Sequence, residues 1–191
     1  MKKLFYFMMP LLLFIIYIIS IWVKPINSMI YLENVNTSEL MNYRIENSED
    51  IGKFDEISSR LPGNISRSGE GLVWGSDANV QADYGYYGGS KFQLKKLERF
   101  WRNNKEKILL FNATIYFILI PKVQTVTIVL DIPNKQKFQV SRSDLVKFYG
   151  RDLNEYYLDS SLFEKEVIKE TIKSKKKLKE FFEIYKIEEV K

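Results

Sequence analysis

The sequence predicts an α+β protein: one N-terminal transmembrane helix, then a single small domain with a mainly antiparallel sheet packed against helices. Three observations lead to this prediction. Leu4 to Val23 is an apolar run of twenty residues without a charge. Between residues 80 and 140, segments alternate apolar and polar side chains as half-buried strands do. Apolar residues at helical spacing occur on both sides of these segments.

The apolar run has the length of a membrane anchor. Twenty helical residues span about 30 Å, the thickness of the hydrocarbon core of a bilayer. Lys2 and Lys3 precede the run and only Lys24 follows it closely, so the positive-inside rule keeps the N-terminus in the cytoplasm. A signal peptide has a shorter apolar region and a small-x-small cleavage site, which Ser20-Ile21-Trp22-Val23 lacks. We therefore expect a retained single-pass anchor in the cell membrane and an extracytoplasmic C-terminal domain.

Composition limits the chemistry. The chain has neither Cys nor His, which excludes disulfides, thiol chemistry and imidazole as base or metal ligand. Without Lys2 and Lys3, 27 of the 29 basic residues remain against 24 acidic ones, too mild a balance for a nucleic-acid partner. No calcium loop or phosphate-binding loop occurs. We expect no catalytic residue, no cofactor and no metal.

Residue patterns divide the chain into four parts. They are a cytoplasmic N-terminus with the anchor, residues 1–23; a connector, 24–47; the α+β domain, 48–159; and an amphipathic, lysine-rich C-terminal helix, 160–191. In the domain, Ser48-Glu49-Asp50 predicts the start of a helix that continues to about Arg60. Leu61-Pro62-Gly63 ends it. Its apolar stripe consists of Ile51, Phe54, Ile57 and Leu61.

Strand-like alternation begins at Gly71. It includes Leu72 with Trp74, and it is clearest from Val80 to Tyr86. Gly88-Gly89 predicts a turn, and Phe92 with Leu94 predicts the start of a partner strand.

The second apolar peak, Ile108 to Ile120, is too long for an ordinary strand and too short to cross a membrane. We expect a helix buried in the core that ends before Pro121. If buried, Asn112 needs hydrogen-bond partners, and a neighbouring backbone is favoured over a ligand.

After this helix the pattern predicts a hairpin and another helix. Val123 to Ile132 alternates like a central strand, Pro133-Asn134 forms a turn, and Phe138 with Val140 lies on the partner strand. Ser141 to Asp144 predicts a capping box, and Gly150 predicts the end of that helix.

The C-terminal segment has a second capping box at Ser161 to Glu164 and helical spacing to about Tyr185. Lysines cluster between its apolar positions. Two interpretations compete: a basic helix that is attracted to anionic lipid or to an acidic envelope polymer, and a helix that docks on the core with a solvated outer face. The second is favoured.

Two groups of residues are candidates for an interaction surface. The first is aromatic, and pairing across an antiparallel sheet is the favoured alternative; the second is the lysine cluster. The candidate residues are Trp74, Tyr84, Tyr86, Tyr87, Lys173, Lys176 and Lys177.

Several segments resemble one protein family: Leu61-Pro62, Asn112-Ala113-Thr114 before Phe117 to Ile120, Phe138, Ser141 to Leu145, and Tyr149 to Leu153. The chain resembles a domain-of-unknown-function family of Gram-positive bacteria, whose members are tethered outside the membrane by one N-terminal helix. The resemblance covers about residues 36–157. It implies an extracytoplasmic α+β module, which some relatives combine with sensor or peptidase-type signalling proteins, and it implies no catalytic residue.

Three functions follow as hypotheses. The first, which we favour, is a non-enzymatic module that binds a protein, peptide or envelope component outside the membrane in sensing or regulation. The second is a carboxylate-dependent envelope hydrolase, which needs two acidic side chains facing each other across a cleft. The third is a structural subunit of a membrane complex that uses the Leu4 to Val23 face.

Overall fold

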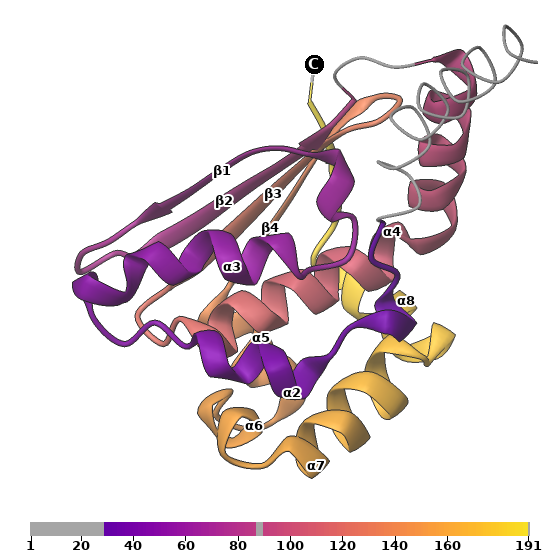
Figure 1. Cartoon of the computed structure of the whole chain (residues 1–191). Helices are drawn as coiled ribbons and strands as arrows, with labels where there is room; N and C mark the ends of the chain where they lie inside the picture. Colours follow the sequence, from indigo (N-terminus) through magenta and orange to yellow (C-terminus); the bar gives the residue numbers. More distant parts are fainter. Residues whose placement is uncertain (1–28, 87–89, 191) are drawn as a thin grey trace, which may run out of the picture.

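The computed structural model describes residues 29–86 and 90–190. The predicted anchor, Leu4 to Val23, lies outside the described residues, as do Tyr87 and the predicted turn at Gly88-Gly89. The fold is α+β, as predicted: a mainly antiparallel five-stranded sheet packs against helices. Figure 1 shows these helices gathered on one side of the sheet.

The strands follow the chain order β1-β2-β3-β4-β5 across the sheet. Neighbours pair antiparallel except β2 and β3, which are parallel and are joined by the long helix α4. The strand bounds are β1 Arg67–Val73, β2 Asn79–Gly85, β3 Thr125–Asp131, β4 Lys135–Ser141 and β5 Glu188–Glu189.

The predicted alternation decides which face of the sheet is covered. In β3, Val126, Ile128 and Leu130 are buried, whereas the residues between them are only partly buried. Phe138 and Val140 of β4 are buried as well. The strand predictions for residues 80–86, 123–132 and 138–140 are therefore confirmed, and so is the hairpin after Pro133-Asn134.

Helix α4 (Lys91–Leu119) is the longest element. Its second half confirms the predicted buried helix, which ends before Pro121. The predicted strand at Phe92 and Leu94 is wrong, because a capping box of Ser90 and Gln93 starts the helix there. Leu97, Phe100 and Trp101 then continue at helical spacing and are buried.

Shorter helices surround the second half of α4. The α-helices are α2 Thr37–Leu40, α3 Lys53–Ser59, α5 Arg142–Tyr149, α6 Asn154–Leu158, α7 Ser160–Leu162 and α8 Lys175–Ile184. The 3-10 helices are η1 Leu32–Asn34, η2 Met41–Tyr43, η3 Ser48–Gly52 and η4 Asn64–Ser66, and η5 Phe163–Ile172 is a π-helix.

The N-terminal helices differ in detail from the prediction. Asn47, one residue before the expected start, accepts hydrogen bonds from the backbone of Glu49 and Asp50. The helix after it is a 3-10 turn followed by α3. Gly63 ends this region with φ 81°, and a Cβ there would lie 2.7 Å from the Trp101 ring. Only glycine fits both demands.

Part of the expected connector belongs to the core. Leu40 and Ile45 have no exposed surface, and the backbone N–H of Ile45 donates to the carbonyl of Leu119 at 2.8 Å. The described residues from Met29 onward thus pack on the same domain as residues 48–159.

The C-terminal segment docks on the core, as the favoured interpretation expected, but it is not one helix. Asp159, rather than Ser161, caps the start by accepting from the backbone of Ser161 and Leu162. A break follows η5, where Ser174 caps α8. Competition from such side chains for backbone groups explains both departures. The buried residues are Phe163, Val167, Ile168, Thr171, Ile172, Leu178 and Phe181.

The side chain of Asn112 links α4 to the sheet and to the segment before β1. The Asn112 amide Nδ2 donates to the Pro62 carbonyl at 3.1 Å and to the Tyr84 hydroxyl at 3.0 Å, as the sequence interpretation of Asn112 expected. Burial raises the pKa of Tyr84 to about 12, so this hydroxyl stays protonated at neutral pH.

Arg142 caps the other end of α4. Its guanidinium donates to the carbonyls of Phe117, Ile120 and Val123, with the last two at 3.0 and 2.8 Å. These are carbonyls at and just beyond the helix C-terminus, where a cation also complements the helix dipole. Burial lowers the pKa of Arg142 to about 10. Arg142 is also the first residue of α5. The predicted capping box of Ser141 and Asp144, which begins this helix, is confirmed.

In the described part of the chain, no helix is both long enough and apolar enough to cross a bilayer.

The Arg142→Met variant tests the cap on α4. It keeps the aliphatic stem but leaves three carbonyls without their charged donor, so we expect the free energy of unfolding to fall by about 2 to 4 kcal/mol. Urea unfolding followed by circular dichroism measures this. Lys147→Met, on the exposed side of the same helix α5, is the control and should change stability by less than about 0.5 kcal/mol. Equal effects of the two variants would contradict the capping role.

Candidate functional site

The strongest candidate is a cation-lined hollow between the middle of α4 and the start of α8, which we call the basic hollow. Its volume is about 610 Å³. Five of its nine lining residues are Lys or Arg, and one is acidic. The lining residues are Arg102, Asn103, Asn104, Lys105, Glu106, Lys107, Lys175, Leu178 and Lys179.

Apolar packing of both helices holds these cations in place. On α8, Leu178 and Phe181 are buried, and the Phe181 ring lies 6.2 Å from that of Phe138 in β4. Lys175 and Lys179 are one helical turn apart, so they lie on the same side of α8. On α4, Trp101 and Ile108 enter the core at both ends of the Arg102 to Lys107 segment. The cations therefore stand on two helices that are fixed to one core.

The charge of the basic hollow is largely uncompensated. Among the described residues, no carboxylate lies within 4.0 Å of the charged nitrogens of Arg102, Lys107 or Lys175. Lys105 donates to the side chain of Gln136 at 2.8 Å, which is a neutral partner. Lys179 has the acidic neighbour Glu183 at 3.7 Å. Such a site attracts a ligand with several negative charges.

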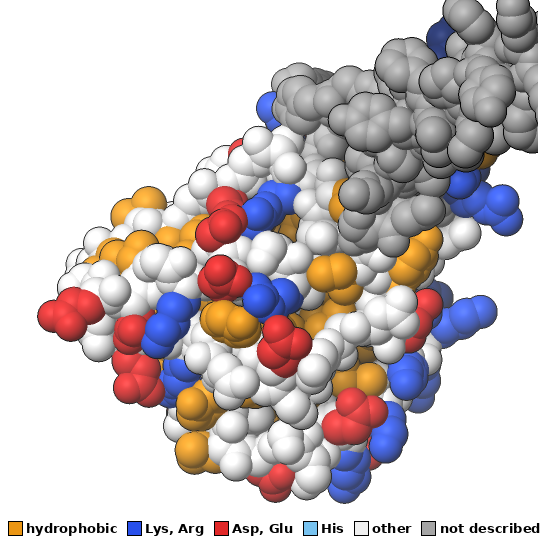
Figure 2. All heavy atoms as spheres, in the orientation of Figure 1, with side chains coloured by type: hydrophobic (Ala, Val, Ile, Leu, Met, Phe, Trp, Pro, Cys, Tyr) orange, Lys and Arg blue, Asp and Glu red, His pale blue; other side chains and the backbone are white. Residues whose placement is uncertain are grey.

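Charges elsewhere are more often paired. Figure 2 shows the face that carries α2 and α3, where acidic and basic side chains lie close together. There Arg60 pairs with Glu39 and Glu56, and Lys53 pairs with Asp50 at 2.7 Å. The basic hollow thus differs from this face in charge balance.

A second, neighbouring hollow contains one of the predicted lysines. Lys173 lines it together with Lys107 and Asn104, which also line the basic hollow, and with Glu164 and Glu33. Lys176 and Lys177 are exposed but are not among the residues that line the basic hollow. Both lie near Glu180, at 3.9 and 3.3 Å. The structure therefore brings only Lys173 of the three close to this site.

The four aromatic candidates do not form one surface. Tyr84 is 1% exposed and belongs to the core, so it cannot lie on an interaction surface. Trp74 follows β1 and Tyr86 follows β2. Because Val73 pairs with Asn79, these two rings lie at opposite ends of the seven-residue β1–β2 ladder, about 20 Å apart. Tyr87 lies outside the described residues.

Sequence reasoning missed Arg102, Lys105 and Lys107. The signal was present: between Lys91 and Lys107 the chain has seven basic and two acidic residues. It was overlooked because the strand predicted at Phe92 concealed the helix that carries these residues.

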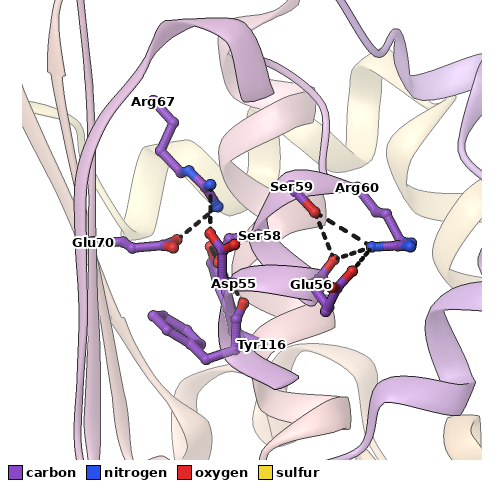
Figure 3. A network of polar contacts seen from close by, with 9 residues as sticks. Asp55, Glu56, Ser58, Ser59, Arg60, Arg67, Glu70 and Tyr116 are labelled. Carbon is purple, nitrogen blue, oxygen red and sulfur yellow. Dashed lines mark hydrogen bonds and ion pairs between the residues drawn. The ribbon is translucent and has the colours of Figure 1, made fainter. Parts of the chain in front are cut away.

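A network of acidic side chains is the second candidate. Figure 3 shows Arg67 of β1 directed at Asp55 of α3 and at Glu70 of β1, with distances of 2.8 and 2.9 Å. Beside it, the hydroxyls of Ser58 and Tyr116 lie 3.1 Å apart. Burial raises the pKa of the Glu70 carboxyl, and the neighbouring Asp55 carboxyl raises it further, while Ser58 and Arg67 act against this rise. The two acids thus lie beside each other, and one guanidinium pairs with both of them, as in a structural ion-pair network.

In the residues that the structure describes, no group of three or more acidic side chains is placed so that it could hold a metal ion.

Comparison of the chain with models of known protein families, with curated proteins and with solved structures found no match. The resemblance to a membrane-tethered family of Gram-positive bacteria therefore stays a prediction and carries no part of the argument below.

The Arg67→Met variant tests the acidic network. Without its cation, the partly buried Glu70 should bind a proton more tightly in the folded than in the unfolded chain, in which its pKa is near 4.5. A carboxyl whose pKa is higher in the folded than in the unfolded chain lowers the free energy of unfolding as the pH rises from the unfolded pKa to the folded pKa. We expect Arg67→Met to cost about 2 to 3 kcal/mol at pH 7.5 and clearly less near pH 4.5.

Urea unfolding at the two pH values measures this difference. In the double variant Arg67→Met, Glu70→Gln the pH dependence should be reduced, because the titrating carboxyl is gone. A loss of stability in Arg67→Met that is the same at both pH values would contradict the role assigned to Glu70.

Proposed function

We propose that the protein is a membrane-anchored, extracytoplasmic and non-enzymatic module that binds an acidic segment of a protein or an anionic envelope component through the basic hollow. The observation that carries this proposal is the group of cations on α4 and α8 without carboxylate partners. What sets these cations apart is their grouping: five of them line one hollow, in which Glu106 is the one acidic residue. Among the described residues, Arg102, Lys107 and Lys175 make no ion pair.

The lining of the basic hollow favours a charged, extended ligand over a small apolar one. Small-molecule pockets are mostly hydrophobic, with a few polar groups that orient the ligand. Here the one buried apolar lining residue is Leu178, and the remaining ones are polar or charged. Long lysine side chains can follow an acidic chain of variable shape, since each ammonium acts as a point charge.

The location outside the membrane is supported by the sequence. Leu4 to Val23 has the length and apolar composition of an anchor, and the lysines before it favour a cytoplasmic N-terminus. Secretion also accords with a chain that contains no thiol to be oxidised. A partner or polymer of the cell envelope would then be the source of the negative charge.

The hydrolase hypothesis receives less support. Its requirement is a pair of acidic side chains open to a substrate. Asp55 and Glu70 lie beside each other, but both are paired with Arg67. No specific observation favours the third hypothesis, a structural subunit that uses the anchor itself.

The location can be tested with single cysteines, because the chain has none of its own. We expect Lys186→Cys to react with a membrane-impermeant maleimide in intact cells, and Lys3→Cys to react only after the membrane is made permeable. A matched reaction at both positions in intact cells would contradict the orientation. Recovery of the full chain in the soluble cytosolic fraction would contradict the anchor.

The ligand can be tested by photo-cross-linking of the full chain in cells. A photoreactive residue at Asn103, which lines the basic hollow, should capture a partner or polymer. The combined Arg102→Gln, Lys107→Gln and Lys175→Gln variant should lower the yield roughly tenfold, and raised salt should lower it for the wild type.

The matched control replaces three exposed lysines outside the basic hollow: Lys147→Gln, Lys165→Gln and Lys186→Gln. It removes the same charge and should leave the yield unchanged. Capture that survives loss of the three cations of the basic hollow, or that falls equally in the control, would overturn the proposed binding site.

A further inference from the structure

The first half of α4 has two different faces. Leu97, Phe100 and Trp101 face the core and are at most 7% exposed. Residues at three- and four-residue spacing on the opposite side are all exposed. We call this side the α4 outer face; it consists of Phe92, Lys95, Lys96, Arg99 and Arg102.

The α4 outer face combines net positive charge with one large apolar side chain. Phe92 is 66% exposed, and the Lys96 ammonium lies 4.7 Å from the centre of its ring. In the described part of the chain, no carboxylate lies within 4.0 Å of Lys95, Lys96 or Arg99. An aromatic ring beside several unpaired cations on one helix face is the composition of a helix that lies at a membrane surface.

The position of the face relative to the anchor is limited by the length of the chain. Met29 and Tyr31 line a hollow of about 560 Å³ together with Lys96, Arg99 and Phe100. The rings of Tyr31 and Phe100 lie 5.3 Å apart. Six residue steps separate Met29 from Val23, the end of the predicted anchor, so this distance is at most about 20 Å.

Headgroups extend about 5 to 8 Å beyond each side of the hydrocarbon core. If Leu4 to Val23 spans the bilayer, the length of the chain limits Met29 to at most about 15 Å beyond the headgroups. The Debye length is about 8 Å at physiological salt, so an anionic surface attracts cations beside Met29 over the shorter part of this range.

We propose that the α4 outer face binds the anionic phospholipid headgroups of the membrane that holds the anchor, with Phe92 at the boundary between headgroups and acyl chains. This proposal rests on the anchor of the proposed function but not on the ligand of the basic hollow. Figure 1 shows that the end of α4 that begins at Lys91 lies away from α6 and α7, and Phe92, Lys95 and Arg99 on this end are exposed.

Anionic lipid explains more of the face than a soluble polyanion does. A soluble polymer would use the cations but would leave Phe92 in water. Insertion of the ring into a bilayer removes that exposed apolar area from water. The connection to the anchor also keeps the bilayer at a high effective concentration near the α4 outer face, whereas a soluble ligand is not linked to the protein.

The test uses the full chain reconstituted in phosphatidylcholine vesicles with or without phosphatidylglycerol. Lys91→Cys, next to the α4 outer face, carries an environment-sensitive fluorophore. We expect its emission to shift to the blue, and a headgroup-attached quencher to reach it, only in vesicles with phosphatidylglycerol. The same label at Gln139→Cys, an exposed position in β4 on the side of the sheet away from the helices, should not respond in either vesicle.

Variants that remove positive charge identify the residues that bind the headgroups. Lys95→Gln, Lys96→Gln and Arg99→Gln together leave the basic hollow intact and should lower the ratio of docked to undocked label on the order of a hundredfold. Lys147→Gln, Lys165→Gln and Lys186→Gln remove the same charge elsewhere and should leave it unchanged. Phe92→Ser should reduce the blue shift while preserving the dependence on phosphatidylglycerol.

The outcomes separate this proposal from the proposed function. A chain that is washed from the vesicles by alkaline carbonate would overturn the anchor and both proposals. An inserted chain whose label at position 91 does not respond to phosphatidylglycerol would overturn this inference alone. A response to inorganic polyphosphate in phosphatidylcholine vesicles, without a response to phosphatidylglycerol, would assign the face to a soluble polyanion and would also overturn it.

Discussion

The burial of the second half of α4 on every side is the constraint on which the rest of the fold depends. From Ile108 to Leu119 every residue is buried, including the polar Asn112 and Thr114. A helix without a solvated face must be enclosed by other elements, and each neighbour meets it differently. Asn112 reaches Tyr84 in the sheet, Tyr116 reaches Ser58 in α3, Thr114 reaches Tyr149 in α5, and Phe111 lies 6.4 Å from Phe163 in η5. The sheet alone cannot bury this helix, which is why the C-terminal segment docks on it.

Most side-chain polar groups of the enclosed helix have partners inside the protein, although the buried Oδ1 of Asn112 has none among the described residues. The Thr114 hydroxyl donates to the Leu110 carbonyl, one turn back, at 2.7 Å. Arg142 supplies donors to the carbonyls of the buried residues Phe117 and Ile120 at the C-terminal end. Burial raises the pKa values of Tyr116 and Tyr149, whose hydroxyls therefore remain neutral partners for Ser58 and Thr114. Hydrogen bonds of this kind fix the rotation of the helix more specifically than apolar packing does, since each has one geometry that satisfies it.

The sequence allowed the buried elements to be predicted better than the exposed ones. Ile108 to Ile120 is recognisable because a charge-free, mostly apolar run of that length is too long for an ordinary strand and too short to cross a membrane. Val126, Ile128 and Leu130 alternate with the period of a strand. The first half of α4 was missed because its core face, Leu97 with Phe100 and Trp101, is interrupted by charges. The break at Ser174 was missed for a different reason: the spacing of buried residues in η5 resembles that of an α-helix, so the apolar pattern does not reveal that the Ser174 side chain caps a new helix. The basic hollow could not be predicted, because it forms between α4 and α8, about seventy residues apart in the chain.

One helix connects the core to both proposed binding surfaces. Phe92 and Arg102 are ten residues apart, or about 15 Å along the axis of α4, and Ile108, a further six residues along, is already in the core. Because α4 continues without a break from the outer face into the core, binding of the α4 outer face to headgroups would set the tilt of the whole domain and the height of the basic hollow above the bilayer. Arg102 belongs to both surfaces. A ligand in the basic hollow and an anionic membrane would therefore share this cation, and the charge on the membrane would influence how strongly the basic hollow attracts its ligand.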